Sequence, residues 1–162
     1  MQRLWSPWRH AYIAASGADT PEVGCIFCEV QKHPENDDKN FVLHRATHNF
    51  VILNLYPYIS GHLMIVPNDH LGEFDSAPKE TTDEMFDLAK RCQAALREVY
   101  RPQGFNIGMN FGRAAGAGIA DHIHMHVMPR WVGDTNFITT IGETRVLPED
   151  LQTTHQKLRE KF

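Results

Sequence analysis

Cysteine is scarce in this sequence, with only three among 162 residues. Cys25 and Cys28 form a close pair, and Cys92 lies far from both. An odd number with one close pair excludes the disulfide framework on which small secreted domains depend. In a reducing compartment such a pair is more typical of metal ligands or of a redox motif. We therefore expect a cytoplasmic protein.

Long apolar runs and basic runs are also missing. No stretch approaches the roughly 20 apolar residues of a membrane-spanning helix. The start, MQRLWSPWRHAYIAASG, has arginines, prolines and tryptophans where a secretory signal needs an unbroken apolar segment. The net charge is −4, which argues against a protein that binds nucleic acid through a clustered basic face. We expect neither a membrane nor a nucleic acid as a partner, whereas small anionic ligands need only a few local donors.

The composition is otherwise that of a globular protein, with 42% hydrophobic and 22% charged residues. The length suits one domain with a proper core, and no internal repeat, low-complexity tract or long linker divides the chain. We expect an irregular N-terminal arm over residues 1–22 and a central domain over 23–135. A C-terminal extension over 136–162 should carry a helix that packs on the same domain.

Hydrophobic patterning predicts five strands and two main helices. We expect the strands at 40–45, 48–55, 61–67, 104–112 and 122–131, and the helices at 81–100 and 147–162. A polar loop, QKHPENDDKN, should follow CIFC, and Thr82 or Asp83 can cap the first main helix. Cys92 falls on the apolar stripe of that helix and should be buried. Because hairpin-length links favour antiparallel pairing, the expected class is α+β.

Residues 121–131 read DHIHMHVMPRW and place histidines at positions 122, 124 and 126. Side chains alternate between the two faces of a strand, so the three imidazoles share one face. We expect that face to be exposed and the intervening apolar residues to face the core. Ordinary surface polarity is one explanation, but three histidines in register rarely arise by chance. Two chemical interpretations remain: a metal shared by neighbouring histidines, or acid–base and nucleophilic chemistry by imidazole itself.

The spacing Cys-x2-Cys in CIFC lets two thiolates bind one tetrahedral zinc ion. A thioredoxin-like redox motif would stand at the start of a helix after a strand, and the expected order of elements does not match that pattern. The chain has no second Cys-x2-Cys, so histidine must supply the remaining ligands. The candidates are His33, His44, His48, His70 and one member of the histidine row.

Several ordered motifs resemble those of the histidine triad (HIT) family of nucleotide hydrolases and transferases. HIHMHVMPRW is similar to the His-x-His-x-His-x-x signature, and NIGMNFG to the strand before it. FVILNLYPYISGHLMIVPNDH is similar to an earlier segment of that family, and CIFC resembles its zinc-bearing branch. The flanks LWSPWRHAYI and GDTNFITTIGETRVLPEDL resemble a subgroup similar to diadenosine tetraphosphate phosphorylases. The resemblance covers residues 25–131, so the central domain is identified as a HIT domain.

The resemblance implies a role for each matching residue. His124 would be the nucleophile that attacks the α-phosphorus. His126 would donate to the phosphate or the leaving oxygen, and His62 would also contact the phosphate. Asn54 would contact the ribose, and Asn110 the phosphate side of the nucleotide. The ligands of a structural zinc ion would be Cys25, Cys28, His70 and His122.

One stretch departs from the family pattern. Many relatives read AGQ-x-V-x-H before the triad, with a glutamine or serine that touches the phosphates. Here AAGAGIADH is one residue longer and lacks the glutamine. We expect the backbone amides of Gly116 and Gly118 to replace that contact, as in anion-binding nests.

The resemblance implies cleavage of a dinucleoside polyphosphate through a nucleotidyl-histidine intermediate, with phosphate or water as the second acceptor. One alternative is a nucleoside phosphoramidase or nucleotide-sugar transferase that uses the same histidine. Another is a non-catalytic zinc domain that binds nucleotides or a protein partner. The resemblance also implies a homodimer, in which two five-stranded sheets join into one continuous ten-stranded sheet. The expected contact is the helix 81–100 together with the edge of GFNIGMN.

Overall fold

A computed structural model describes residues 24–141 and 147–162. The expected arm over residues 1–22 lies outside the described residues. In chain order the elements are α2 (Ile26–Lys32), the 3-10 helix η1 (Pro34–Asn36), α3 (Asp37–Asn40), β1 (Val42–Arg45), β2 (Asn49–Leu53), β3 (Leu63–Pro67), α4 (Lys79–Tyr100), β4 (Gly104–Met109), the 3-10 helix η2 (Arg113–Ala115), β5 (Met125–Arg130), α5 (Phe137–Ile141) and α6 (Leu151–Arg159).

The five strands form one antiparallel sheet in the order β1-β2-β3-β5-β4. The central strands β2 and β3 read NFVIL and LMIVP and are buried along their whole length, as the apolar runs predict. The register places His126 of β5 opposite Met64 of β3 and Gly108 of β4. The predicted α+β class and its five-stranded antiparallel sheet are confirmed.

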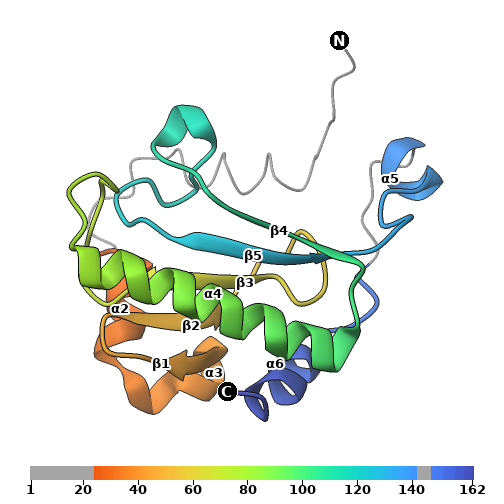
Figure 1. Cartoon of the computed structure of the whole chain (residues 1–162), viewed down its shortest axis with the longest axis horizontal. Helices are drawn as coiled ribbons and strands as arrows, with labels where there is room; N and C mark the ends of the chain where they lie inside the picture. Colours follow the sequence, from red (N-terminus) through yellow and green to blue (C-terminus); the bar gives the residue numbers. More distant parts are fainter. Residues whose placement is uncertain (1–23, 142–146) are drawn as a thin grey trace.

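Alternation along the strands gives the sheet two faces with separate apolar cores. Val51 and Val127 belong to the core on the face that α4 covers. Phe50 and Met64 belong to the other core, together with Phe27 of α2. Figure 1 shows α4 crossing the front of the sheet. His126 is paired with Met64, so its side chain lies on the α2 face of the sheet.

Helix α4 buries the apolar stripe that its periodicity predicts, with Met85, Leu88 and Leu96 in the core. Cys92 is also fully buried, as expected, and burial raises the pKa of its thiol to about 12. The expected side-chain caps are wrong. The helix begins at Lys79, earlier than predicted, and Pro78 occupies the N-cap position.

The predicted polar loop after CIFC is wrong, because this segment is helical. Residues 26–32 form α2, and residues 34–40 form the short helices η1 and α3. Phe27 and Val30 are three positions apart, so they lie on one face of α2, and both are buried in the second core. Helices this short are not stable in isolation, so packing against the sheet stabilises α2.

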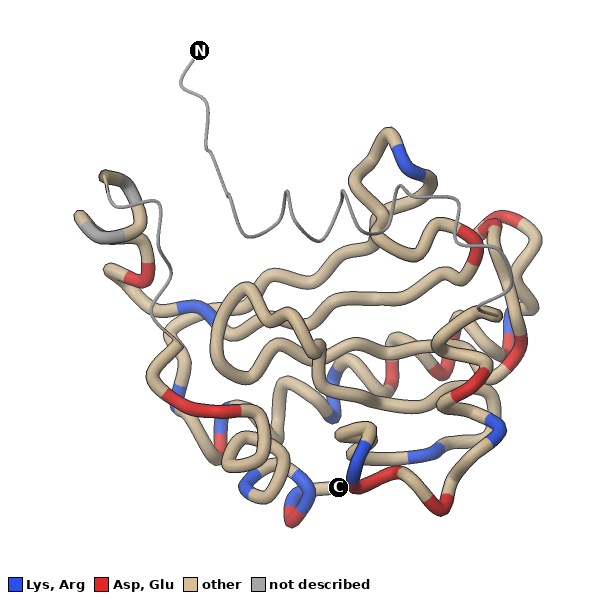
Figure 2. The backbone as a smooth tube through the Cα atoms, turned by 180° about the vertical axis from the view of Figure 1, so that it is seen from behind, with Lys and Arg blue, Asp and Glu red and all other residues tan. Residues whose placement is uncertain are grey.

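The C-terminal helix is shorter than predicted. It begins after Asp150, whose carboxylate accepts a hydrogen bond from the backbone N–H of Thr153 at 2.7 Å. It packs against β1 and α4, and the short α5 precedes it. Figure 2 shows the charged residues mainly on helices and loops around the sheet, and the central strands β2 and β3 carry none. No described helix is long and apolar enough to cross a membrane.

Candidate active site and metal centre

The histidine row is buried, and the prediction that it forms an exposed face is wrong. Strand β5 begins at Met125, so His122 and His124 precede it and only His126 lies within it. In chain order the three histidines are 0%, 5% and 7% exposed. Phe27 of α2 lies over the row, with ring centroids 5.4 Å from His122 and 5.3 Å from His124. The three histidines are therefore interior residues, covered by α2.

A pocket of about 620 Å³ lies beside the row, on the face of the sheet that α2 covers. It brings together most of the residues for which a substrate contact was expected, namely Asn54, Asn110, Gly116, Gly118, His124 and His126. His62 does not line this pocket, because its side chain is completely buried behind the wall. Any influence of His62 on a ligand must therefore pass through a neighbouring side chain.

His124 is held in the form that a nucleophile needs. Its Nδ1 lies 3.0 Å from the backbone carbonyl oxygen of His122. A carbonyl oxygen can only accept, so Nδ1 carries the proton and Nε2 keeps its lone pair. Burial lowers the pKa of His124, an effect that this hydrogen bond partly opposes. Burial thus favours the neutral imidazole, and the hydrogen bond leaves the lone pair of that form on Nε2.

His126 is oriented by a chain of hydrogen bonds that starts in the backbone. The N–H of Tyr58 donates to Nδ1 of His62 at 3.2 Å, so Nδ1 of His62 is an acceptor and its proton lies on Nε2. That Nε2 donates to Nδ1 of His126 at 2.9 Å. The proton of a neutral His126 must then lie on Nε2. This series of hydrogen bonds makes Nε2 of His126 a donor, as donation to a phosphate or leaving oxygen requires.

Asn54 follows the last residue of β2 and lines the pocket. Its Oδ1 accepts a hydrogen bond from the N–H of Tyr56 at 2.9 Å, which fixes the orientation of the amide. Its Nδ2 then points to Nδ1 of His62 at 3.5 Å. Asn110 lines the same pocket and directly follows β4. Both asparagines therefore stand where a strand ends beside the pocket.

The glycines before the triad shape a turn around η2. Gly116 adopts the left-handed conformation, with φ 90°, which favours glycine. Its N–H donates to the carbonyl of Arg113 at 3.0 Å, so this amide serves the turn and is not the phosphate donor that the sequence suggested. The N–H of Gly118 has no backbone partner among residues 24–141 and 147–162. A phosphate contact by the amide of Gly118 therefore stays a prediction.

Sequence reasoning missed several residues of this pocket. Phe27 forms part of its wall, yet the motif CIFC drew attention only to the cysteines. Lys39 and Arg113 are the two cations of the pocket, and neither forms an ion pair within the described ranges. They are far apart in the sequence and belong to no basic run, so no local pattern marks them. The ring of Tyr58 packs on the rings of both His62 and His126, with distances between ring centroids of 4.7 and 6.0 Å.

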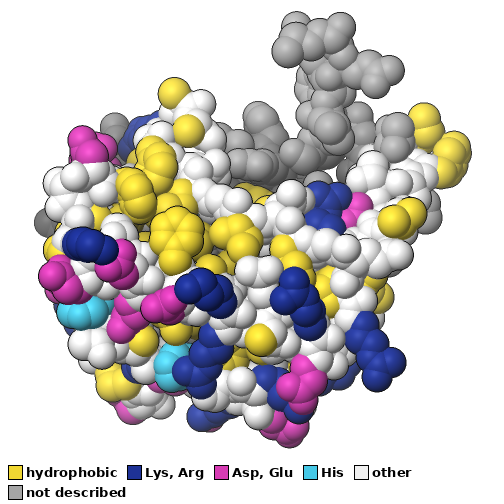
Figure 3. All heavy atoms as spheres, viewed as in Figure 1, with side chains coloured by type: hydrophobic (Ala, Val, Ile, Leu, Met, Phe, Trp, Pro, Cys, Tyr) yellow, Lys and Arg dark blue, Asp and Glu magenta, His cyan; other side chains and the backbone are white. Residues whose placement is uncertain are grey.

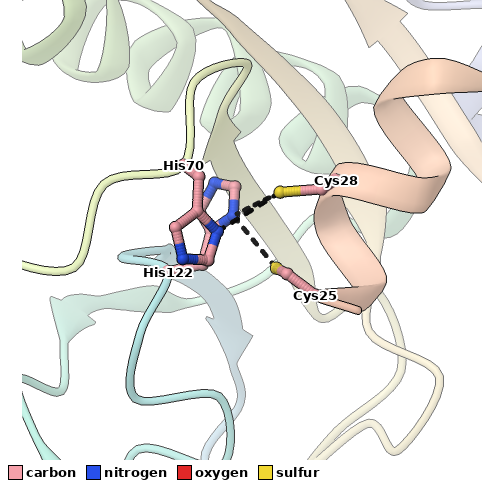
Figure 4. Close-up of side chains that lie close together, drawn as sticks. All are labelled: Cys25, Cys28, His70 and His122. Carbon is pink, nitrogen blue, oxygen red and sulfur yellow. Dashed lines mark hydrogen bonds between the residues drawn. The ribbon is translucent and has the colours of Figure 1, made fainter. Parts of the chain in front are cut away.

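A cluster of sulfur and nitrogen ligands lies at the other end of the histidine row (Figure 4). One potential ligand atom from each of four residues lies within 4.8 Å of the others, from Cys25, Cys28, His70 and His122. These are the residues that the resemblance implied. The cysteines come from α2 and its N-cap, His70 from the loop after β3 and His122 from the segment before β5.

The geometry of this cluster fits a tetrahedral zinc ion. Nδ1 of His122 lies 3.2 Å from Sγ of Cys25 and 3.7 Å from Sγ of Cys28, and Nδ1 of His70 lies 3.3 Å from Sγ of Cys28. Zinc–sulfur and zinc–nitrogen bonds of normal length give a tetrahedral sulfur–nitrogen edge of about 3.6 Å. Nε2 of His122 donates to the carbonyl of Pro67 at 3.0 Å, which leaves its Nδ1 as the ligand.

The other candidate histidines have different partners. His33 contacts the carboxylate of Glu35 at 2.9 Å, and the ring of His44 stacks on Phe162. His48 is not part of the cluster. The cluster and the triad share His122, and the carbonyl of that residue orients His124. A bound metal would therefore hold in place the segment that carries the candidate nucleophile.

Comparisons with known proteins agree with this geometry. A family model described as HIT domain matches residues 35–132. The chain is 36% identical over 163 residues to AP-4-A phosphorylase of Mycobacterium tuberculosis, which covers 98% of this chain and 83% of the relative. It is 27% identical over 115 residues to an adenosine 5'-monophosphoramidase of Saccharomyces cerevisiae, covering 71% of this chain and 68% of the relative.

A solved structure of a Zn-bound histidine triad family protein from Mycobacterium smegmatis has the same fold. Its TM-score is 0.69 at 29% identity, with 85% of this chain and 92% of that chain covered. Together with the relatives named above, the buried triad supports a nucleotide-cleaving enzyme. The family model spans more than half of the sequence, and a relative at 36% identity covers nearly all of it, so the chain belongs to the HIT family.

Proposed function

We propose that the protein cleaves dinucleoside polyphosphates of the diadenosine tetraphosphate type through a nucleotidyl intermediate on His124. One observation carries the proposal: the pocket places the lone pair of His124 Nε2 beside His126, whose hydrogen bonds leave a proton on Nε2. The similarity to AP-4-A phosphorylase over 98% of this chain supports the choice of substrate.

The first step forms a P–N bond and breaks a P–O bond. Nε2 of His124 attacks the α-phosphorus, and the electron pair of the broken bond leaves with the terminal oxygen of the departing nucleotide. A neutral imidazole can approach phosphate oxygens that would repel a carboxylate. Nε2–H of His126 donates a hydrogen bond to the leaving oxygen and stabilises its developing charge. Lys39 and Arg113 supply positive charge to the same pocket.

The second step reverses the first with a new acceptor. Inorganic phosphate attacks the adenylyl group, the P–N bond breaks, and its electron pair returns to Nε2 of His124. Phosphate as acceptor yields ADP beside the ATP released earlier, whereas water would yield AMP. Dividing one displacement into two is the advantage of covalent catalysis.

His62 is proposed as a positioning residue. It is completely buried, and it donates to Nδ1 of His126 at 2.9 Å. It therefore acts on the substrate by fixing which nitrogen of His126 carries the proton. This replaces the direct phosphate contact that the resemblance implied, because His62 does not line the pocket.

We propose zinc as a structural cofactor. Cys25, Cys28, His70 and His122 would hold the ion with four protein ligands, which would leave no open position for substrate, and the ion would cross-link α2 to the triad segment. Cys25 and Cys28 bind metal as thiolates, and a reducing cytoplasm keeps them in that state. No step of the reaction requires the metal.

We also propose a homodimer formed along β4. This strand lies at the end of the sheet and pairs only with β5 among the described strands. Ile107 of β4, Phe111 just after it and Phe86 of α4 are large exposed apolar residues. Figure 3 shows hydrophobic side chains gathered next to α4 on this side of the molecule. Edge pairing with a second copy would extend the sheet and cover these side chains.

The similarity to the yeast phosphoramidase favours one second candidate, the hydrolysis of a nucleoside phosphoramidate by the same histidine. Product analysis separates the two. Diadenosine tetraphosphate is incubated with the protein, with and without inorganic phosphate, and the nucleotides are separated. We expect ADP and ATP only when phosphate is present. Turnover of adenosine 5'-phosphoramidate without turnover of the dinucleotide would refute the proposal.

The variant His124→Ala tests the role of the histidine in the same assay. It should lose turnover but keep nucleotide binding and fold. Persistent turnover by this variant would remove the intermediate from the mechanism. Loss of turnover together with loss of nucleotide binding would instead favour a non-catalytic role of the row in binding.

A further inference from the structure

A second pocket of about 620 Å³ lies farther along β5, at the end of the strand remote from the metal cluster. Its lining includes Met128 and Arg130 of β5 and Trp131, the next residue. Alternation puts Met128 and Arg130 on the same face of β5 as His126. Tyr58 lines both pockets, so one side chain stands at the boundary between them.

The charges of this second pocket are already paired. The guanidinium of Arg130 donates to both oxygens of Asp134, at 2.6 and 2.8 Å. Lys157 forms an ion pair with Glu149. The active-site pocket differs, because its cations Lys39 and Arg113 form no ion pair within the described part of the chain. The second pocket therefore suits an uncharged group better than a phosphate.

The lining is suited to a flat aromatic group with polar edges. Trp131 is half-buried there, and Tyr58 and Tyr100 add aromatic surface. Thr135 and Asn136 add uncharged polar groups to the lining. A nucleobase is neutral, stacks on aromatic side chains and carries polar groups along its edge.

The direction of the proposed reaction leads to the same place. His126, the donor to the leaving oxygen, lies beyond His124 on the side of Met128 and Arg130. Arg130 is four positions after His126 along the strand, which corresponds to about 13 Å. The leaving group of a dinucleoside polyphosphate is a nucleotide whose phosphate chain begins at His126 and whose nucleoside lies farther away.

We propose that this second pocket, defined by Tyr58, Trp131 and Asp134, binds the distal nucleoside of a dinucleoside polyphosphate. The proposal rests on the function proposed above and names the feature that selects dinucleotides over mononucleotides. Tyr58 links the two pockets, since it contacts His126 on one side and lines the distal site on the other.

Two substrates of equal phosphate length test the proposal. Diadenosine tetraphosphate has a distal nucleoside and adenosine tetraphosphate does not. The ratio of their kcat/KM values is measured for the wild type, Trp131→Ala and Trp131→Phe. We expect the alanine variant to lose about tenfold of the preference for the dinucleotide, as for removal of one stacked base, and the phenylalanine variant to keep most of it.

Two further variants control for folding and for general damage. Val132→Ala changes the neighbouring residue, whose side chain is 86% exposed and lines neither pocket, and should leave the ratio unchanged. Asn136→Trp fills the distal pocket without removing Trp131, and should lower kcat/KM for the dinucleotide alone. An unchanged ratio in Trp131→Ala and Asn136→Trp, with wild-type turnover intact, overturns the distal site but not the proposed function. Absence of wild-type turnover of either substrate overturns both.

Discussion

Replacing His62 with leucine should reduce kcat while leaving KM nearly unchanged. The substitution removes the donor that lies 2.9 Å from Nδ1 of His126, in a place with no exposed surface. A buried acceptor left without its donor costs about 1–3 kcal/mol. His126 can then escape this cost by moving its proton from Nε2 to Nδ1 and pairing differently. In that form it no longer donates to the leaving oxygen.

The expected decrease in kcat can be calculated if the whole cost raises the free energy of the transition state. A loss of 1–3 kcal/mol corresponds to a decrease in kcat of about 5- to 150-fold. KM should change little, because His62 does not line the substrate pocket. The matched variant His62→Gln keeps an amide donor for His126 and an acceptor for the N–H of Tyr58. It should retain kcat within about fivefold of the wild type.

The assay is steady-state cleavage of diadenosine tetraphosphate with inorganic phosphate, accompanied by thermal unfolding of each variant. A leucine variant with kcat within twofold of the wild type would refute the positioning role. A rise in KM with unchanged kcat would also refute it, since that pattern indicates a contact made equally in the ground and transition states.

Three further predictions concern the metal, an ion pair and the dimer. If zinc is present at about a thousandfold above its Kd, its removal by a chelator should lower Tm by roughly 10 °C. Thiol titration of the metal-free protein should then find both Cys25 and Cys28 reactive. An unchanged Tm in the metal-free protein would contradict a structural site. The Arg130 guanidinium holds the pKa of Asp134 at about 2, below its ordinary 3.8. The ion pair therefore stabilises the folded state fully above about pH 5, and this stabilisation is lost as the pH falls through 2. Asp134→Asn should therefore lower Tm by about 1–3 °C at pH 6 but not at pH 2, and a difference that grows towards pH 2 would exclude this ion pair as the cause. Ile107→Asp should convert a dimer into a monomer in light scattering, whereas Val132→Asp should not; an unaffected dimer would place the interface elsewhere.

The sheet and the main helix could be predicted because their patterns are local. The apolar runs of β2 and β3 and the helical periodicity of α4 each lie within one continuous segment. The site residues could be named because the family motifs tie chemistry to position. The four cluster residues then come together in space, although Cys25 and His122 are 97 positions apart.

The rest depended on contacts between distant segments. Helix α2 is too short to show periodicity, and it forms because Phe27 and Val30 pack on the sheet. The same helix covers the histidine row, which strand alternation alone predicts to be exposed. Lys39 of the pocket beside the histidine row has no local signature, because its neighbours in the pocket are supplied by other elements.

The stereochemistry at the α-phosphorus tests the central claim most directly. Diadenosine tetraphosphate with a sulfur atom on each α-phosphorus, of known configuration, is cleaved in the presence of inorganic phosphate. The configuration of the resulting adenosine thiodiphosphate is then determined. Attack by His124 followed by attack of phosphate comprises two in-line displacements, so the account predicts retention of configuration. Inversion would mean a single displacement and would contradict a nucleotidyl-histidine intermediate.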